Sequence, residues 1–384
     1  MVKFGYKFSN LCGSVYQCGN VVYTPDGDSL LSAVGSRVTM FDLRKHSSIT
    51  LPFEAKNDVK RMAITPNGRL LLVVDTDGNS LCVDLPHRVV LYRFNFKKCP
   101  DALEFSPNGD FFAITHGRIV QIWKTPGKQR VFMPFVLHKT FGGHHDNILS
   151  LFWSPDSKRL VTGSADLSLR VYIVPSLEAT SMRALLHLDA EDGKPETRYK
   201  ASTLAGHRER VLACFFTGNG AGIVSVAADG AVFEWAEESA GYQQQSDIDG
   251  GVKTTFWKLV KKSFIQPDHS KLVCATMGGN LLLAGFSHGV FGLYEMPGCT
   301  NVYTLSISQN KIDTVAINST GDWVAFGAAD LGQLLVWEWK SETYVLKQQG
   351  HYYDVNAVSY SPDGQLAVTG GDDSKLKVWN TTNG

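Results

Sequence analysis

The stretch "GHYYDVNAVSYSPDGQLAVTGGDDSKLKVW", from Gly350 to Trp379, decides the fold. Three apolar runs follow its opening Gly-His, and two turns separate them. The first turn, Ser-Pro-Asp-Gly, suits a tight hairpin, because proline presets φ, the Asp side chain bonds its own backbone and glycine closes the turn. The last run alternates apolar and polar residues after an Asp and finishes at Trp379. The stretch therefore predicts three consecutive antiparallel strands.

The same pattern recurs along the chain. Its first half, an apolar run, a turn and a second apolar run, also begins at Val21, Met62, Leu103, Leu151 and Val315. The turn prolines of the first three copies, Pro25, Pro66 and Pro107, lie 41 residues apart. The second half ends in eight places: Phe41, Val83, Trp123, Tyr172, Trp235, Tyr294, Trp337 and Trp379. Self-similarity at a period of about 40 residues predicts an array of eight repeated units.

Three repeats share a more specific register. Each opens on Gly-His, and residues 18, 22 and 28 positions after the histidine are Ser or Thr, Asp, and Trp or Tyr. The three sets are His144, Thr162, Asp166 and Tyr172; His207, Ser225, Asp229 and Trp235; and His351, Thr369, Asp373 and Trp379. One register in three separate segments is far more specific than any single dipeptide.

These residues resemble the hallmarks of the WD-repeat family, over nearly the whole chain. The resemblance implies an all-β fold, a β-propeller whose blades each hold four antiparallel strands. It also implies that the histidine, hydroxyl, Asp and Trp of a repeat form one hydrogen-bonded chain inside the blade. Two repeats carry the full set, and the repeat at His144 has Tyr172 at the Trp position. The other repeats must rely mainly on apolar packing.

Two architectures fit eight repeats. Seven blades can close a first propeller over residues 1–349, with residues 350–384 as one further repeat that begins a second propeller. Alternatively, all eight repeats close into one ring. The chain resembles WD-repeat proteins that are more than twice this long and have two tandem propellers, and this resemblance implies seven blades and an N-terminal portion. Alternation of Phe4, Tyr6 and Phe8 predicts a strand that pairs with the final blade of the ring it closes.

Composition narrows the classes of function. Formal net charge is zero, whereas a strong nucleic-acid-binding domain usually carries a basic excess. Seven cysteines, an odd number without zinc-knuckle spacing, are typical of reduced thiols in an intracellular protein. No signal-peptide core and no run of about 18 apolar residues occur, so we expect no membrane association.

Catalytic and metal-binding interpretations are weak. Ser, His and Asp in one repeat suggest a catalytic triad, but the same trio recurs in three repeats at a spacing that suits a structural network. The "GGHHD" stretch from Gly142 to Asp146 lacks further zinc ligands at suitable spacing. We find no phosphate-binding lysine loop. The sequence therefore predicts no enzyme, no cofactor, no metal site and no small-molecule substrate.

Two stretches interrupt the repeats, residues 176–200 and 236–251, and the segment to Ile265 follows the second. Its lysines are interleaved with aromatic residues, a pattern that can serve RNA phosphates and bases. The favoured interpretation is an edge strand with a solvated lysine face. The candidate RNA or partner contacts are Lys253, Lys258, Lys261 and Lys262.

Some phrases resemble one branch of the WD-repeat family more closely, notably Leu331 to His351, with its "WEW" and "QQGH", and the opening "YKFSNLCGSVYQCGN". That branch is nucleolar and belongs to the small-subunit processome. The resemblance implies a non-catalytic scaffold for processing the precursor of small-subunit rRNA. The implied partners are other WD-repeat processome proteins, and the U3 small nucleolar RNA and pre-rRNA through the complex. The alternatives are a cytoplasmic adaptor, for ubiquitin ligation or signalling, and direct RNA binding.

Overall fold

The computed structural model describes residues 8, 10–127, 131–175, 201–239, 255–265 and 270–382 of the chain. Within these ranges every regular element is a β-strand except one 3-10 turn, η1 (Ala329–Leu331). Of the two predicted insertions, residues 176–200 and 240–251 lie outside the described ranges, as does Lys253, whereas residues 236–239 belong to a strand. The prediction of an all-β fold is confirmed.

The strands form seven four-stranded antiparallel sheets and one three-stranded sheet, each a meander of consecutive strands. The first three sheets hold β1 (Val22–Tyr23), β2 (Ser29–Val34), β3 (Arg37–Asp42), β4 (Ser47–Thr50); β5 (Val59–Ile64), β6 (Leu70–Asp75), β7 (Asn79–Asp84), β8 (Val89–Asn95); and β9 (Leu103–Phe105), β10 (Phe111–His116), β11 (Ile119–Lys124), β12 (Val136–Phe141). The fourth and fifth hold β13 (Ile148–Trp153), β14 (Arg159–Ser164), β15 (Ser168–Ile173), β16 (Ser202–Ala205); and β17 (Val211–Phe216), β18 (Gly222–Ala227), β19 (Ala231–Ser239), β20 (Thr255–Phe264). The last three hold β21 (Leu272–Gly278), β22 (Leu281–Phe286), β23 (Val290–Glu295), β24 (Thr300–Ser306); β25 (Thr314–Ile317), β26 (Trp323–Ala328), β27 (Gln333–Glu338), β28 (Thr343–Gln349); and β29 (Val355–Tyr360), β30 (Leu366–Gly371), β31 (Leu376–Asn380).

The predicted hairpin turns join the first two strands of their sheets. In the second sheet, the backbone N–H of Gly68 donates to the carbonyl of Thr65 at 2.8 Å, and Gly68 has φ 68°. The Thr65 hydroxyl oxygen accepts the N–H of Leu70 at 2.9 Å, where β6 begins. Ser106, Ser154, Thr217 and Ser361 accept the corresponding N–H in their own turns. The Ser or Thr before the proline position therefore anchors the start of the second strand, a role beyond that of the proline, Asp and glycine.

Burial explains why the second strands read as continuous apolar runs. Every residue of β6 and β10 is buried, whereas the outer strand β8 is largely accessible. A strand is buried on both faces when another sheet packs against each side, so alternation of apolar and polar residues is lost there. Apolar clusters fill the space between each pair of successive sheets from the first to the seventh.

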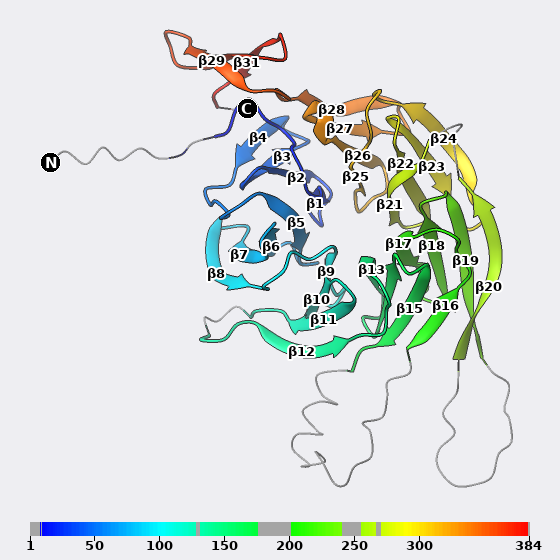
Figure 1. Ribbon diagram of the computed structural model, residues 1–384. Helices are drawn as coiled ribbons and strands as arrows, with labels where there is room; N and C mark the ends of the chain where they lie inside the picture. Colours follow the sequence, from blue (N-terminus) through cyan, green and yellow to red (C-terminus); the bar gives the residue numbers. More distant parts are fainter. Residues whose placement is uncertain are drawn as a thin grey trace, which may run out of the picture.

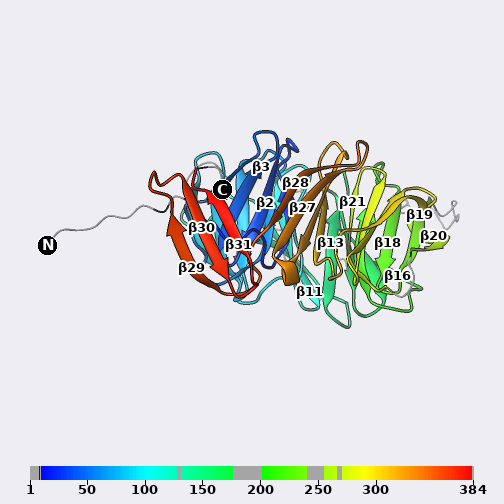
Figure 2. The same cartoon turned by 90° about the horizontal axis from the view of Figure 1, so that it is seen from above.

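The first sheet also packs against the seventh. Tyr23, Leu30 and Phe41 share one buried cluster with Ala325 and Val336. Figure 1 shows the seven sheets around a common centre, with the first strand of each sheet innermost, and Figure 2 shows the disc from the side. This arrangement favours seven blades over eight, and the boundary at residue 349 stays a prediction.

The three-stranded sheet β29–β31 lies at the edge of the disc (Figure 1). Among its large apolar residues, Val358, Tyr360 and Leu376 are exposed, whereas the corresponding residues of the other sheets are covered by a neighbouring sheet. Trp379 still contacts the cluster between the first and seventh sheets. The eighth repeat therefore folds into the three strands that the sequence predicts, and no sheet of the described residues covers its outer face.

The predicted N-terminal strand is not formed at its one described residue. Phe4 and Tyr6 lie outside the described residues, and Phe8 belongs to no strand. Its ring lies 4.0 Å from the Arg37 guanidinium, on the first sheet. The seventh sheet has β28 as its fourth strand, whereas the sheet of the eighth repeat has three strands among the described residues, and Phe8 pairs with neither sheet.

The residues that follow Asn10 have a different role. Val15 and Tyr16 are buried in the cluster between the first and seventh sheets. The carbonyl of Gly13 accepts the N–H of His351 at 2.7 Å. This segment therefore packs between the first and seventh sheets and bonds to the eighth repeat, although it adds no strand.

Candidate functional site

The His351 set forms a continuous network in which His351, Thr369 and Asp373 are buried and Trp379 is half-buried. The Nδ1 of His351 lies 2.9 Å from Asp373 Oδ1, and its Nε2 lies 2.8 Å from the Thr369 hydroxyl. The indole N–H of Trp379 donates to the same hydroxyl oxygen at 2.8 Å. With the histidine proton on Nδ1, each group donates to the next in the order Trp379, Thr369, His351, Asp373. Burial would raise the pKa of Asp373, but the hydrogen bonds from His351 and from the Lys375 N–H outweigh it and lower that pKa.

The histidine of the His144 set makes the same two contacts as His351, but the last residue of the set is a tyrosine. His144 Nδ1 lies 2.9 Å from Asp166 Oδ2, and Nε2 lies 2.8 Å from Thr162 Oγ1. Tyr172 replaces the tryptophan, and its hydroxyl donates to the Gly142 carbonyl at 3.3 Å. Burial lowers the pKa of His144, and the contacts with Asp166 only partly oppose that effect. The histidine is therefore neutral and held in place at neutral pH.

The His207 set is incomplete. Nε2 lies 2.7 Å from Ser225 Oγ, and Trp235 Nε1 donates to that oxygen at 3.0 Å. Nδ1 is buried and has no hydrogen-bond partner among the described residues, while Asp229 accepts the N–H of Ala231 at 3.0 Å. The prediction that Asp229 completes this chain is wrong. Burial lowers the pKa of His207 to about 4.

A stacked ring takes the place of the missing carboxylate. The Phe233 ring lies parallel to the His207 imidazole, with 4.0 Å between centroids and 13° between planes. The ammonium group of Lys262 lies 4.9 Å from the Phe233 ring centroid. Burial and the nearby cation favour a neutral imidazole, since a positive His207 would lose solvation and repel Lys262.

These networks stabilise blades and offer little to a substrate. The three histidines, Thr162, Ser225 and Thr369 are buried, and each hydroxyl already bonds its histidine. A nucleophile needs an accessible atom and a base that is free to take its proton. In the described part of the chain, no group of three His, Cys, Asp or Glu residues is placed to hold a metal ion. The geometry thus supports a structural role for the sets found in the sequence.

The described lysines lie on β20, the outermost strand of the fifth sheet, as the edge-strand interpretation predicts. Lys258 forms an ion pair with Glu238 at 3.0 Å, and Lys261 donates to the Gly298 carbonyl at 2.9 Å. Lys262 covers Phe233, as described above. All three ammonium groups therefore have a partner within the chain, which weakens the case for an RNA-binding patch.

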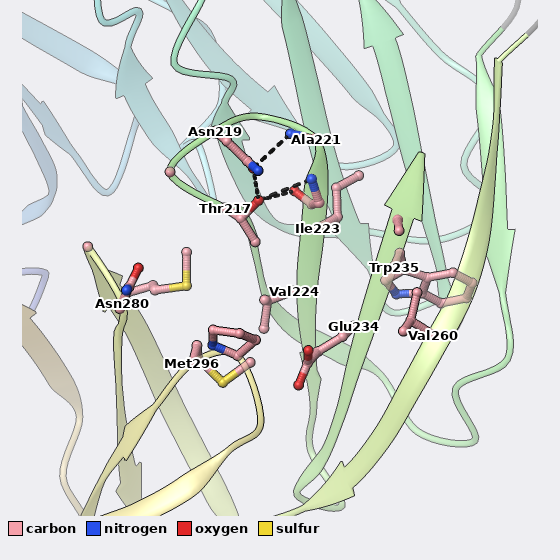
Figure 3. Close-up of a pocket in the computed structure, with 16 residues that line it drawn as sticks. Thr217, Asn219, Ala221, Ile223, Val224, Glu234, Trp235, Val260, Asn280 and Met296 are labelled. Carbon is pink, nitrogen blue, oxygen red and sulfur yellow. Dashed lines mark hydrogen bonds between the residues drawn. The ribbon is translucent and has the colours of Figure 1, made fainter. Parts of the chain in front are cut away.

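A pocket that the sequence analysis missed lies between the fifth and sixth sheets (Figure 3). It has a volume of about 550 Å³, within the usual range of ligand sites. Its walls are mainly apolar, with Val224 on the side of the fifth sheet and Met277 and Met296 on the side of the sixth. The two sides are far apart in the sequence and meet only when the blades pack, so no local motif marks the pocket.

Among the described residues that line this pocket, Glu234 is the one that carries a charge. Figure 3 shows its side chain pointing toward Met296 of the sixth sheet. One carboxylate oxygen accepts the N–H of Gly298 at 3.2 Å. The pocket therefore combines apolar walls with a single anionic group, a composition that suits a cationic group on an apolar stem.

Comparison with known proteins agrees with the fold and the networks. The model of the family "WD domain, G-beta repeat" matches residues 135–172 and 342–380, which contain parts of the His144 and His351 sets. The molecule is thus a WD-repeat protein with the architecture of a β-propeller. It belongs to the family of periodic tryptophan protein 2, as its relatives show.

Relatives of that name are similar over almost the whole chain. The Neurospora crassa homolog is 43% identical over 97% of this chain. The Saccharomyces cerevisiae protein is 41% identical and the Mus musculus homolog 40% identical, each over 100% of this chain. The match covers 40%, 41% and 44% of these relatives, so the chain spans less than half of their length. No helix in the described ranges is long and apolar enough to cross a membrane.

Proposed function

We propose that this chain is a non-catalytic scaffold of the small-subunit processome, needed to process the precursor of small-subunit rRNA. The observation that carries the proposal is the similarity to periodic tryptophan protein 2 over nearly the whole chain. The buried networks support it, because the His, Ser and Thr side chains that suggest catalysis are used to hold blades together. A rigid disc that offers several faces is well suited to hold partners in place.

The proposed partners are other WD-repeat proteins of the processome, with the U3 small nucleolar RNA and pre-rRNA reached through the complex. The occupied lysines of β20 and the zero net charge support contact with RNA through partners. The proposed location is the nucleolus. A cytoplasmic adaptor shares the fold but would be excluded from that compartment.

Depletion of the full-length protein tests the proposal. We expect precursors of small-subunit rRNA to accumulate and mature small-subunit rRNA to fall, while large-subunit rRNA changes less. Re-expression of the full-length protein is the control and should restore processing. Normal small-subunit rRNA after depletion, or a tagged protein absent from the nucleolus, would contradict the proposal.

A further inference from the structure

We propose that the pocket between the fifth and sixth sheets binds an arginine side chain of a protein partner, flanked by an apolar residue. The proposal concerns partner chemistry at one site and does not depend on the role in rRNA processing. It rests on three features of the pocket, its charge, its walls and its rim.

Glu234 supplies the only charge among the lining residues in the part of the chain that the structure describes. The part of the chain that the structure describes contains no ion-pair partner within 4.0 Å of this carboxylate. Its hydrogen bond to the Gly298 N–H uses one oxygen. The nearby ammonium of Lys261 is held by the Gly298 carbonyl at 2.9 Å. Glu234 therefore presents a negative charge to the pocket, which a cationic side chain would complement.

The walls favour a cation that carries an apolar stem. Val224, Met277 and Met296 line the same pocket as Glu234. Methionine side chains adapt their shape to an incoming group, and arginine buries its methylene stem along apolar surface. The guanidinium is less strongly hydrated than an ammonium and pairs with carboxylates through two hydrogen bonds. Arginine thus suits this site better than lysine does.

The rim of the pocket indicates which kind of partner residue would lie next to the arginine. Val260 lines the pocket and is 66% exposed, although it is an aliphatic residue in a strand. The pairing of β19 and β20 shifts there, since Trp235 pairs with Leu259 and Glu234 with Lys261. This bulge turns Val260 out of the regular ladder toward the pocket mouth. An apolar neighbour of the arginine in the partner would cover Val260.

Methionine methyl signals report on the pocket directly. Met277 and Met296 line it, whereas Met40 and Met62 lie in the cluster between the first and second sheets and serve as internal controls. The protein is labelled with ¹³C-methyl methionine and titrated with acetyl-Leu-Arg-Leu-amide. We expect saturable shifts of the Met277 and Met296 signals only. The peptide with citrulline in place of arginine, which is neutral and similar in shape, should bind at least tenfold more weakly.

Two variants test the roles of Glu234 and Val260. Glu234→Gln keeps an oxygen that can accept the Gly298 N–H, so the fold should persist, and affinity for the arginine peptide should fall about tenfold. Glu238→Gln, four residues along β19 and outside the pocket, is the matched control and should change affinity less than twofold. Val260→Lys, at an exposed position, should also weaken binding. Equal affinity for the arginine and citrulline peptides, unchanged affinity in Glu234→Gln, or no shift of Met277 and Met296 would overturn the proposal.

Discussion

Acidification should destabilise the fifth sheet through His207. Burial lowers the pKa of His207 from 6.5 to about 4 in the folded protein. The unfolded chain therefore binds a proton between pH 6.5 and 4 that the folded protein does not, so stability falls as the pH drops through this window. From these two pKa values, the loss between pH 7.0 and pH 4.5 is about 2 kcal/mol.

The physical reason is the lack of a partner for the charged form. In the described ranges His207 Nδ1 has no acceptor, Asp229 accepts the N–H of Ala231, and Lys262 lies over the stacked Phe233 ring. A proton on the imidazole would place an unpaired charge in the blade. His351 differs, because its Nδ1 already faces both oxygens of Asp373.

Urea unfolding at pH 7.0 and pH 4.5 measures this effect in the native protein and in His207→Gln. The difference in unfolding free energy between the two pH values should be about 2 kcal/mol smaller in the variant, because glutamine does not titrate. Comparing each protein with itself removes the baseline effect of the substitution. The same pH dependence in both proteins would refute the reasoning.

Three further predictions follow from other residues. Thr369→Ala leaves the Trp379 indole and His351 Nε2 without their shared partner, so it should lower the free energy of unfolding by about 2 kcal/mol, measured as faster amide exchange in β29–β31. Thr369→Ser keeps the hydroxyl and should retain protection. Unchanged exchange in Thr369→Ala would count against the network. Glu104→Gln should raise the urea midpoint at pH 8 more than at pH 5. Burial raises the Glu104 pKa well above 4.5, so ionisation of this carboxyl at higher pH destabilises the native protein but not the variant. An equal effect of the substitution at both pH values would exclude this explanation. Joint replacement of Lys258, Lys261 and Lys262 by alanine should change affinity for a single-stranded RNA less than twofold in a filter-binding assay, since each ammonium has an internal partner; a large, salt-dependent loss would restore the RNA hypothesis.

The sequence by itself determined the repeated hairpins and the core of each blade. Glycine at Gly68 and its counterparts, with an anchoring hydroxyl before the proline position, specifies a turn through contacts within five residues. Runs such as that from Leu70 to Asp75 mark strands buried on both faces. The His351 set was also predictable, because its members lie within one repeat and their register recurs.

The predictions from sequence were wrong where a contact depends on the direction in which a side chain points. Asp229 stands at the same spacing as Asp373, yet Phe233 stacks on His207 and the carboxylate does not reach Nδ1. Spacing along the chain places a residue in a turn but does not fix where its side chain points. Phe8 has the alternation of a strand residue, but it packs on Arg37 instead.

Only the tertiary structure decided how the sheets meet. Tyr23 packs in the same cluster as Val336, so segments about 300 residues apart in the sequence are in contact. The pocket at Glu234 likewise arises from the packing of two blades. Local turns and strands are set by residues close in sequence, so the repeats can be read directly. The packing of one sheet on another depends on side chains from separate repeats. The contact of the first sheet with the seventh and the shape of the pocket therefore appear only in the folded molecule.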